Sequence, residues 1–530
     1  MPTHEVQNQP PPLEDHDPVA LDAALREALQ REGAGWAEKE VAEFGRRTAS
    51  RQAIEWGFLA NANPPRLKTH DRFGNRIDEV EFHPAWHELM RLSISHGVHA
   101  LPWRDPRPGA QVARAALMML DSQNEFGHGC PISMTYSAFP ALQQLLEPWG
   151  AKITSLHYDP RSIPSAQKSG ALIGMAMTEK QGGSDVRANT TRAERADGAY
   201  LLTGHKWFCS APMSDAFLVL AQAEKGLSCF LLPRWTPEGA RNRFHLQRLK
   251  DKLGNRSNAS AEVELDGAWA QLVGEEGRGL QAILEMVNHT RLDCVIASSG
   301  MMRQALAQAM HHCAYRRAFG KRLAEQPLMR AVLADLALES EAATALMMRL
   351  ARSYQGKEEA PFRRIATAIA KYWICKRAAP HAAEALECLG GNGYVEESIL
   401  PRVYREAPLN SLWEGSGNVI CLDVLRALAK EPQAREALVA ELRLGRGADG
   451  HLDRALDTVL AQVQQPEESQ ARRLVESLAL ALQASLLVRH SPPAVADAFC
   501  ATRLGEQSYA FGALPKGADV SAILSRAWPA

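Results

Sequence analysis

The chain has 530 residues, of which 46% are hydrophobic and 23% are charged. At about 150 residues per domain this length predicts three or four domains, and the composition excludes a single small fold and global disorder. The 60 basic and 61 acidic residues leave a formal net charge of -1, which excludes a chain-wide electrostatic attraction to nucleic acid or to a membrane surface. Any polyanion would have to be bound by a local basic patch.

Five regions follow one another along the chain. Residues 1–18 are polar and proline-rich and predict an extended arm, which drapes over a surface or another subunit. Residues 19–175 predict a helical domain in which Gly and Pro residues separate the helices. Residues 176–278 contain short apolar runs separated by Gly, Pro, Asn and Asp, which is typical of a β domain. Helical periodicity returns over 279–433, and 434–530 forms a further helical piece.

One long helix is predicted in the fourth region. Its apolar residues recur at intervals of three, four and seven, as they do on the buried face of a helix. They are Leu328, Val332, Leu336, Ala343, Met347, Leu350 and Tyr354. An apolar run over 478–488 is shorter than the ~20 residues of a membrane helix, so we interpret it as a buried helix and expect no membrane span.

The nine cysteines occur without a CxxC pair. This spacing argues against a disulfide framework or a metal site and favours reduced thiols in the cytoplasm. The N-terminus does not have the basic residues followed by an apolar stretch that are typical of a secretion signal, so we expect no such signal.

The first candidate site is segment 176–185, which reads AMTEKQGGSD and opens the β domain. Consecutive glycines let a backbone approach an anion or a flat ring without obstruction by a Cβ atom. The following Ser and Asp can supply hydroxyl and N–H contacts. The segment therefore indicates a phosphate or cofactor loop, with a surface turn as the alternative.

The second candidate is segment 204–210, GHKWFCS, a strand-like run with two adjacent aromatic residues. Neighbours in a strand face opposite sides, so Trp207 and Phe208 cannot both belong to the core by simple alternation. One of them could stack on a flat ring. The alternative is that the two rings cover opposite faces of a small barrel.

Two more glycine-rich segments follow. A helix C-cap explains only one of the three glycines in segment 387–394, ECLGGNGY, so we expect close backbone approach to a ligand or a subunit there. Segment 412–418, LWEGSGN, places Glu414 between an indole and a glycine. Desolvation raises a carboxyl pKa and makes Glu414 a candidate general base, the alternative being a solvated loop residue.

Together the four segments resemble the acyl-CoA dehydrogenase superfamily in their order and approximate spacing across residues 170–430. The signatures are T-E-x-x-x-G-S-D before the β domain, G-G-x-G-Y before the E-G loop, and R-x-x-F-G, which segment 316–320 matches. The resemblance implies an α+β, mainly α fold: an N-terminal helical domain, a central β-barrel, a C-terminal helical bundle and here an extra C-terminal helical domain. It also implies bound FAD, an acyl-CoA thioester substrate and a homotetramer.

The resemblance carries over to individual residues. In it, Glu414 removes the α-proton of an acyl thioester while the β-hydrogen leaves as hydride to the flavin. FAD would be contacted by Met177, Thr178, Gln181, Gly182, Gly183, Ser184 (near the pyrophosphate), Phe208, Cys209 and Ser210, and beside the base by Trp413, Gly415, Ser416 and Asn418. A neighbouring subunit would hold the adenine and pyrophosphate end through Arg316, Phe319, Glu387, Gly390 and Gly391.

Two positions depart from the family pattern. Glu387 stands where many members have Gln, and its charge would repel a pyrophosphate unless it is turned away or paired. Pro327 falls where a cofactor-contacting Gln often follows R-x-x-F-G, which leaves Gln326 as its substitute.

The resemblance extends to one subgroup, the AidB-type alkylation-response flavoproteins, which are related to isovaleryl-CoA dehydrogenases. It rests on segments 177–185, 249–260 (LKDKLGNRSNAS) and 413–418, with the arm and the extra C-terminal domain. The subgroup implies weak acyl-CoA dehydrogenase activity and binding of double-stranded DNA in the response to DNA alkylation. DNA contact is attributed to the C-terminal domain and bordering basic residues, where Arg426 matches.

The charge of the C-terminal domain bears on DNA binding. Residues 434–530 carry 10 basic and 11 acidic side chains, whereas a duplex-binding surface needs clustered positive charge. The fold would have to gather the arginines on one face, and the alternative is a solvated helical surface that makes tetramer contacts. The candidates are Arg426, Arg435, Arg443, Arg446, Arg472 and Arg473, joined by Arg363, Arg364, Lys371, Lys376 and Arg377.

Two other functions stay open. One is a metabolic acyl-CoA dehydrogenase for a short branched thioester such as isovaleryl-CoA, with Glu414 as the base and FAD as the hydride acceptor. The other is a flavin-bearing assembly scaffold without turnover.

Overall fold

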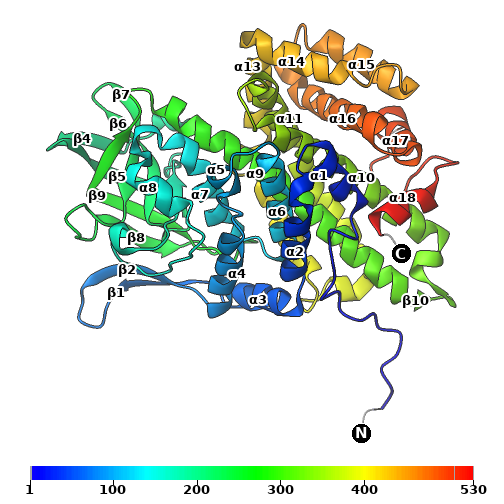
Figure 1. The fold of residues 1–530 in the computed structure, drawn as a ribbon, viewed down its shortest axis with the longest axis horizontal. Coiled ribbons are helices and arrows are strands. Elements are labelled where there is room, and N and C mark those ends of the chain that lie inside the picture. The colour runs from blue at the N-terminus through cyan, green and yellow to red at the C-terminus, as the bar shows by residue number, and fades with distance from the viewer. Residues whose placement is uncertain (1–2, 507, 529–530) are drawn as a thin grey trace. The chain divides into compact units, whose positions relative to one another are not determined.

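The computed structural model describes residues 3–506 and 508–528. The chain folds into two compact units, whose elements are labelled in Figure 1. The first unit comprises the described residues of Met1–Arg51, Pro108–Asn124 and Arg291–Ala530, and the second comprises Gln52–Arg107 and Glu125–Thr290. Within the described part of the chain, no helix combines the length and the apolarity needed to cross a bilayer.

The second unit contains a closed β-barrel. Its strands are β3 (Ile173–Ala176), β4 (Arg192–Ala196), β5 (Ala199–Ser210), β6 (Ala216–Ala223), β7 (Gly226–Pro233), β8 (Phe244–Leu249) and β9 (Ser260–Val273). Strands β6, β4, β5, β9 and β7 pair in that order, and β7 pairs again with β6, which closes the ring. Phe217, Phe230 and Phe244 belong to the apolar cluster that fills the barrel, as the alternation of a barrel strand requires. The predicted central β-barrel is confirmed.

Helices and one hairpin complete this unit. The helices are α3 (Arg51–Ala62), α4 (Pro84–Ser95), α5 (Leu101–Arg104), α7 (Gly129–Ala141) and α8 (Leu146–Ile153). The hairpin of β1 (Arg66–His70) and β2 (Arg76–Glu81) interrupts a region where we predicted only helices. Its turn forms because Asp71 Oδ1 accepts the N–H groups of Phe73 (2.8 Å) and Asn75 (2.9 Å). The strands are too polar to show an apolar alternation, so the sequence pattern missed them.

The first unit is helical. Its helices are α1 (Ala23–Arg31), α2 (Glu38–Thr48), α6 (Ala110–Asn124), α9 (Gly279–Tyr315, which begins in the second unit), α10 (Pro327–Ser353), α11 (Ala360–Glu387), α12 (Leu400–Glu406), α13 (Gly417–Lys430), α14 (Pro432–Arg443), α15 (Gly450–Gln462), α16 (Ala471–His490), α17 (Pro493–Cys500) and α18 (Val520–Ala527). Helix α10 confirms the predicted long helix, and Pro327 begins it because the first turn needs no N–H donor. Of the predicted buried face, Leu328 is 86% exposed and Val332 is half-buried. Helix α16 confirms the predicted buried helix.

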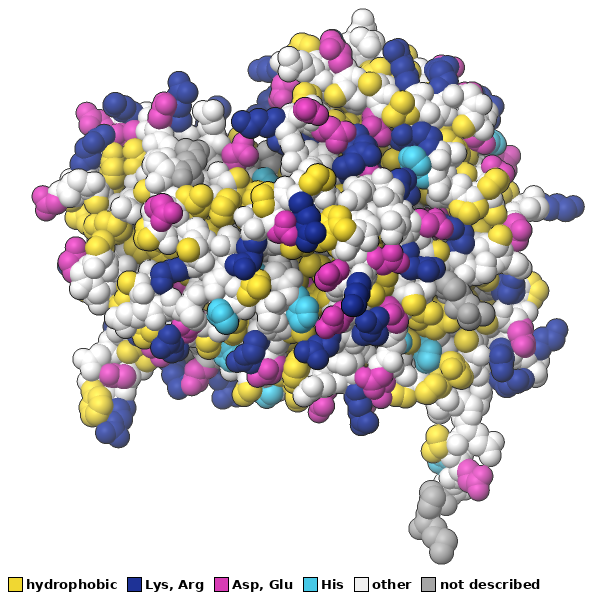
Figure 2. Space-filling model, viewed as in Figure 1, with side chains coloured by type: hydrophobic (Ala, Val, Ile, Leu, Met, Phe, Trp, Pro, Cys, Tyr) yellow, Lys and Arg dark blue, Asp and Glu magenta, His cyan; other side chains and the backbone are white. Residues whose placement is uncertain are grey.

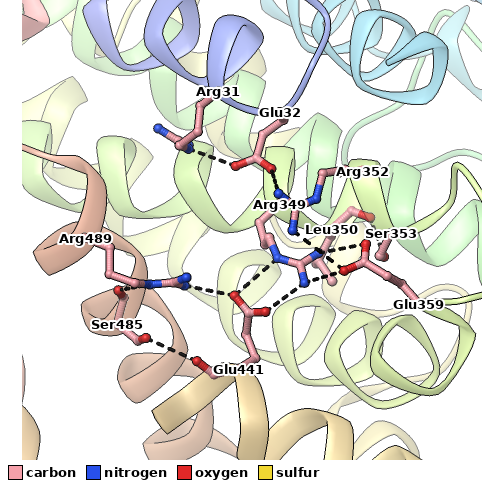
Figure 3. Close-up of polar contacts among 10 residues, drawn as sticks. All are labelled: Arg31, Glu32, Arg349, Leu350, Arg352, Ser353, Glu359, Glu441, Ser485 and Arg489. Carbon is pink, nitrogen blue, oxygen red and sulfur yellow. Dashed lines mark hydrogen bonds and ion pairs between the residues drawn. The ribbon is translucent and has the colours of Figure 1, made fainter. Parts of the chain in front are cut away.

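A buried ion network attaches the C-terminal helices to the bundle within this unit (Figure 3). Arg349 of α10 donates to Glu441 of α14 and to Glu359, each at 2.7 Å. Arg489 of α16 donates to the same Glu441 at 2.9 Å. Burial raises the pKa of Glu441, but the hydrogen bond and charge of Arg349 outweigh it and hold the pKa below its ordinary value. The ionised carboxylate therefore links α10, α14 and α16.

Residues 3–17 form neither helix nor strand, in keeping with the predicted arm, whose first two residues lie outside the described residues. The arm leads into α1, whose N-cap Asp22 accepts the N–H of Leu25 at 3.0 Å.

Candidate active site

The loop after β3 is organised by a buried carboxylate, that of Glu179, with 0% exposure. Lys206 Nζ lies 2.8 Å from Glu179 Oε1, Thr191 Oγ1 donates to the same oxygen at 2.6 Å, and the Thr190 N–H donates to Oε2 at 2.7 Å. Burial raises the pKa of Glu179, but the hydrogen bonds from Lys206 and Thr191 outweigh it and hold the pKa far below its ordinary value. Glu179 therefore stays ionised and fixes the loop to β5.

Two glycines shape the tip of this loop. Gly182 has a φ of 142° and exchanges backbone hydrogen bonds with Glu179. A Cβ on Gly183 would lie 2.4 Å from Thr178 Oγ1, so only glycine fits there. Gln181 Nε2 donates to Glu179 Oε2 at 2.8 Å, so this predicted cofactor side chain supports the loop instead of pointing out of it.

The other predicted residues of this loop are partly or fully accessible. Met177 and Thr178 are half-buried, and Ser184 is exposed. The Trp207 N–H donates to the Thr178 carbonyl at 2.8 Å, and Asn189 Nδ2 donates to the Met177 carbonyl at 3.0 Å. These contacts hold the loop beside β5.

Trp207 and Phe208 lie at a β-bulge. The pairing of β5 with β9 shifts register between Lys206 and Cys209, both of which are buried. An extra residue at that point turns both rings away from the barrel core, leaving Trp207 half-buried and Phe208 52% exposed. The two rings therefore do not cover opposite faces of the barrel, and Phe208 offers an accessible face for stacking.

Cys209 and Ser210 follow the bulge. The Cys209 thiol belongs to the barrel core, where burial raises its pKa to about 12. Its side chain therefore cannot contact a cofactor as predicted, and only its backbone could. Ser210 is half-buried, with its Oγ 3.5 Å from Ser260 Oγ.

Glu414 lies in the first unit, in the loop before α13, on a strained backbone. Its φ of 59° is a left-handed conformation, which costs a non-glycine residue about 1–3 kcal/mol. Arg291 Nε donates to the Glu414 carbonyl at 3.0 Å. Lys371 Nζ donates to the next carbonyl, that of Gly415, although Lys371 is only 1% exposed. Two cations thus hold consecutive carbonyls of this loop.

A third charge anchors this arrangement. Asp423 Oδ2 lies 2.9 Å from Arg291 Nη1, and Asp423 also pairs with Arg364 (2.9 Å) and Arg426 (2.6 Å). Burial raises the pKa of Asp423, but Arg291 and Arg364 outweigh it and hold the pKa below its ordinary value. Asp423 thereby orients the guanidinium that holds the Glu414 carbonyl.

The remaining predicted residues of this segment flank Glu414. Trp413 Nε1 donates to Asn410 Oδ1 at 2.9 Å. Ser416 occupies the N-cap position of α13, and Asn418 is exposed in its first turn.

The predicted adenine-end residues occupy two exposed turns of the first unit. Strands β10 (Arg317–Ala318) and β11 (Lys321–Arg322) form a hairpin whose loop residues, Phe319 and Gly320, have φ values of 51° and 79°. The Phe319 ring is 96% exposed. In the turn η6 (Gly390–Gly393), a Cβ on Gly390 or Gly391 would meet no atom within 4 Å. The packing of this chain does not require Gly391, so close approach of a ligand or second chain accounts for it better.

Charge at the hairpin fits a dinucleotide. Arg316, Arg317, Lys321 and Arg322 form no ion pair with another described residue. The Glu325 carboxylate accepts the Arg322 backbone N–H at 2.9 Å, and four cations against this one carboxylate still attract an anion such as a pyrophosphate. With the accessible Phe208 ring and the glycine loop, the residues present fit FAD.

Glu387 is exposed at the end of α11, where its charge adds to the effect of burial in raising the pKa of Glu384.

The predicted DNA-contacting arginines lie on α13, α14 and α16 and in the loop after α14. Arg446 pairs with Asp457, and Arg472 Nε donates to Tyr372 Oη at 3.2 Å. Lys371 is buried at the Glu414 loop, so its predicted place on this surface is wrong. On the face in Figure 2, Lys and Arg side chains are interspersed with Asp and Glu.

Sequence reasoning missed the residues that hold these loops. Glu179 lay inside a recognised motif, but no role was assigned to it. Lys206 was the one Lys or Arg in the strand-like segment GHKWFCS, and this charge was a usable signal. Nothing local marked Lys371 or Arg291, because their acceptors lie 44 and 123 residues away.

Three family models match the chain: the adaptive response protein AidB N-terminal domain over residues 8–160, the acyl-CoA dehydrogenase middle domain over 174–268 and the acyl-CoA dehydrogenase C-terminal domain over 277–429. AidB of Escherichia coli (strain K12) is 49% identical over 511 residues, 95% of this chain and 94% of that protein. Acyl-CoA dehydrogenase family member 11 of Caenorhabditis elegans is 33% identical over 78% of this chain and 70% of its own length. The structure of Caenorhabditis elegans ACDH-11 in complex with C11-CoA matches with a TM-score of 0.82 and 27% identity, covering 99% of this chain and 93% of that one.

Proposed function

We propose a function for this chain from one premise: it belongs to the acyl-CoA dehydrogenase family and, within that family, to the AidB group. Members of the family are FAD-dependent flavoproteins, and this chain is an acyl-CoA dehydrogenase-type oxidoreductase. The specific role that we propose is a flavoprotein of the adaptive response to DNA alkylation. In this role it binds double-stranded DNA and retains weak activity on isovaleryl-CoA-like thioesters.

Glu414 is the proposed base that takes the α-proton of the thioester. Bound FAD supplies the hydride acceptor for the dehydrogenation. The observation that carries the assignment is the φ of 59° at Glu414, held by Arg291 and Lys371 on consecutive carbonyls. A strained conformation persists only where its surroundings hold it, and such residues cluster at active sites.

The proposed FAD contacts divide into three sets. The loop after β3 and the bulge of β5 would contact the flavin, with Gln181 and Cys209 contributing only backbone atoms. The residues around Glu414 would close the site. The hairpin and η6 would receive the adenine end of FAD bound by a neighbouring copy.

Anaerobic addition of isovaleryl-CoA tests the proposed chemistry. A C11 acyl-CoA serves as a second thioester, because a relative was solved with C11-CoA. We expect slow bleaching of the flavin absorbance, in keeping with weak activity. Rapid, complete bleaching would favour the alternative, a metabolic dehydrogenase for short branched thioesters, and no bleaching with either thioester would favour a scaffold without turnover.

DNA binding is proposed through one set of arginines on adjoining helices: Arg426, Arg435, Arg443, Arg446, Arg472 and Arg473. Phosphates would compete with Asp423 for Arg426 and with Asp457 for Arg446. If binding uses phosphate contacts, affinity falls with salt, and neutralising Arg472 and Arg473 together lowers the slope of log K against log salt by about 2. Duplex binding that ignores salt, or no binding, would remove the DNA role.

We also propose a homotetramer in the cytoplasm. The exposed Phe319, Leu328 and Tyr394 side chains of the first unit supply apolar surface for subunit contacts. All nine cysteines are free thiols, which suits a reducing compartment. Light scattering of the FAD-loaded protein tests the subunit number.

A further inference from the structure

The N-terminal arm pairs with the β10–β11 hairpin through one side chain, Asn8. Asn8 Nδ2 donates to the Arg317 carbonyl at 2.9 Å, and the Arg317 N–H donates to Asn8 Oδ1 at 2.7 Å. The amide thus satisfies both backbone groups of Arg317 on the edge of β10 that β11 leaves open, as a neighbouring strand would. Asn8 does so at a φ of 57°, which asparagine tolerates better than most residues.

The same stretch of the arm contacts the other adenine-end elements. The Asn8 carbonyl accepts a hydrogen bond from Arg316 Nη1 at 2.6 Å. Asn392 Nδ2 of the turn η6 donates to Gln9 Oε1 at 3.3 Å. His311 Nε2 lies 2.8 Å from the Pro11 carbonyl oxygen, which fixes the arm to the end of α9. Asn8 and Gln9 therefore lie against the two turns to which the adenine end of FAD is assigned, and Pro11 lies against α9.

The hairpin needs such support. It has only two pairs of residues, and its loop holds a phenylalanine in the left-handed region, where a bulky side chain is a costly outlier. Its four cations repel one another and have no ion-pair partner among the described residues. Gln326 Nε2 donates to the Ala318 carbonyl and the Glu325 carboxylate accepts the Arg322 N–H, each at 2.9 Å, while Asn8 holds the open edge of β10. A hairpin this short depends on each of these contacts for its position.

We infer that the arm is a positioning element for FAD: Asn8 holds the 316–322 hairpin, and through its carbonyl the Arg316 guanidinium, in the position that binds the adenine and the anionic pyrophosphate of FAD. The inference rests on the proposed assignment of this hairpin to FAD. It gives residues 8–11 a role in cofactor retention that is separate from the chemistry at Glu414.

Asn8→Gly tests this role in the full-length protein. Glycine accepts the φ of 57° and keeps the carbonyl that receives Arg316, while both side-chain bonds to Arg317 are lost. We expect FAD to dissociate about tenfold faster, followed by the rise in flavin fluorescence on dilution, since two neutral hydrogen bonds contribute an effect of this size. The unfolding temperature of the FAD-free protein should not change.

Two matched variants separate positioning from general damage to the arm. Asn8→Asp keeps the acceptor for the Arg317 N–H and should release FAD at an intermediate rate. Removal of residues 3–7, which leaves the contacts of Asn8, Gln9 and Pro11 in place, should release it at the wild-type rate.

The outcomes distinguish this inference from the proposed function. If the wild-type protein binds FAD and Asn8→Gly releases it no faster, the inference is wrong and the function stands. Faster release after removal of residues 3–7 alone also contradicts it. A wild-type protein that takes up no FAD overturns the proposed function and the inference together.

Discussion

Glu179 and Glu414 are two carboxylates from recognised motifs that the fold treats in opposite ways. Around Glu179 the protein holds the side chain: Lys206, Thr190 and Thr191 donate to its oxygens, and no part of it is exposed. Around Glu414 the protein holds the backbone: Arg291 and Lys371 donate to carbonyls, and the side chain is half-buried.

The difference separates a carboxylate used for folding from one proposed for chemistry. A carboxylate saturated with donors stays ionised and cannot take a proton at neutral pH. A loop held through its carbonyls is fixed in space by contacts to the backbone. A motif match alone therefore does not tell which acid reacts.

The largest expected effect belongs to Glu414→Gln. This change removes the proton acceptor and keeps the size of the side chain, so we expect flavin reduction by isovaleryl-CoA to slow by about 10²–10⁴-fold. Anaerobic stopped-flow absorbance measures the rate. Glu397→Gln, at an exposed carboxylate, is the control and should leave the rate unchanged. A near wild-type rate in Glu414→Gln would place the base elsewhere and break the comparison.

Glu179→Gln should act on stability instead. It leaves the buried Lys206 ammonium without its carboxylate, which lowers the free energy of unfolding by about 3–5 kcal/mol. Urea unfolding followed by circular dichroism measures the loss. Glu194→Gln, on the exposed side of β4, should cost no more than about 0.5 kcal/mol.

The pair can also be removed as a whole. Because replacing a buried ion pair with apolar groups is often neutral, Glu179→Gln combined with Lys206→Met should recover most of the lost stability. If the double variant is less stable than Glu179→Gln alone, Lys206 acts through contacts other than Glu179.

Lys371→Met tests the Glu414 loop, which the protein holds through its backbone carbonyls. It leaves the Gly415 carbonyl without its buried donor, and a small displacement of reacting groups lowers a rate by about 10–100-fold. We expect slower flavin reduction by isovaleryl-CoA with an unchanged FAD content per chain, measured by absorbance. Lys357→Met, at an exposed lysine, is the control. Equal loss of FAD and of rate would show that Lys371 serves cofactor binding and not the loop.

The smallest expected effect is a pH dependence of the stability contributed by Glu179. Its pKa is lowered in the folded state, so its contribution is complete above the ordinary pKa of about 4.3 and is lost as the pH falls through the lower folded value. The difference in unfolding free energy between wild type and Glu179→Gln should shrink by about 1 kcal/mol between pH 5 and pH 3.5. Urea titrations at these pH values measure it, and a constant difference would mean that Glu179 is not ionised in the fold.

Much of the fold could be predicted from local patterns. The barrel, the long helix α10 and the buried helix α16 follow from periodicity over contiguous residues. The β1–β2 hairpin could not, because its stability comes from a side-chain-capped turn and not from apolar alternation. The exposure of Phe208 likewise depends on a bulge against β9, which no single strand reveals.

The sequence by itself determined the family, the fold class and the candidate base, because each depends on residue types at short, fixed spacings. Only the tertiary structure decided which side chains hold the two loops, that Lys371 is buried instead of at the surface, and that the arm lies against the hairpin at Arg317. These contacts join residues that are 11 to 309 positions apart, and most such pairs form only after strand register and helix packing bring them together.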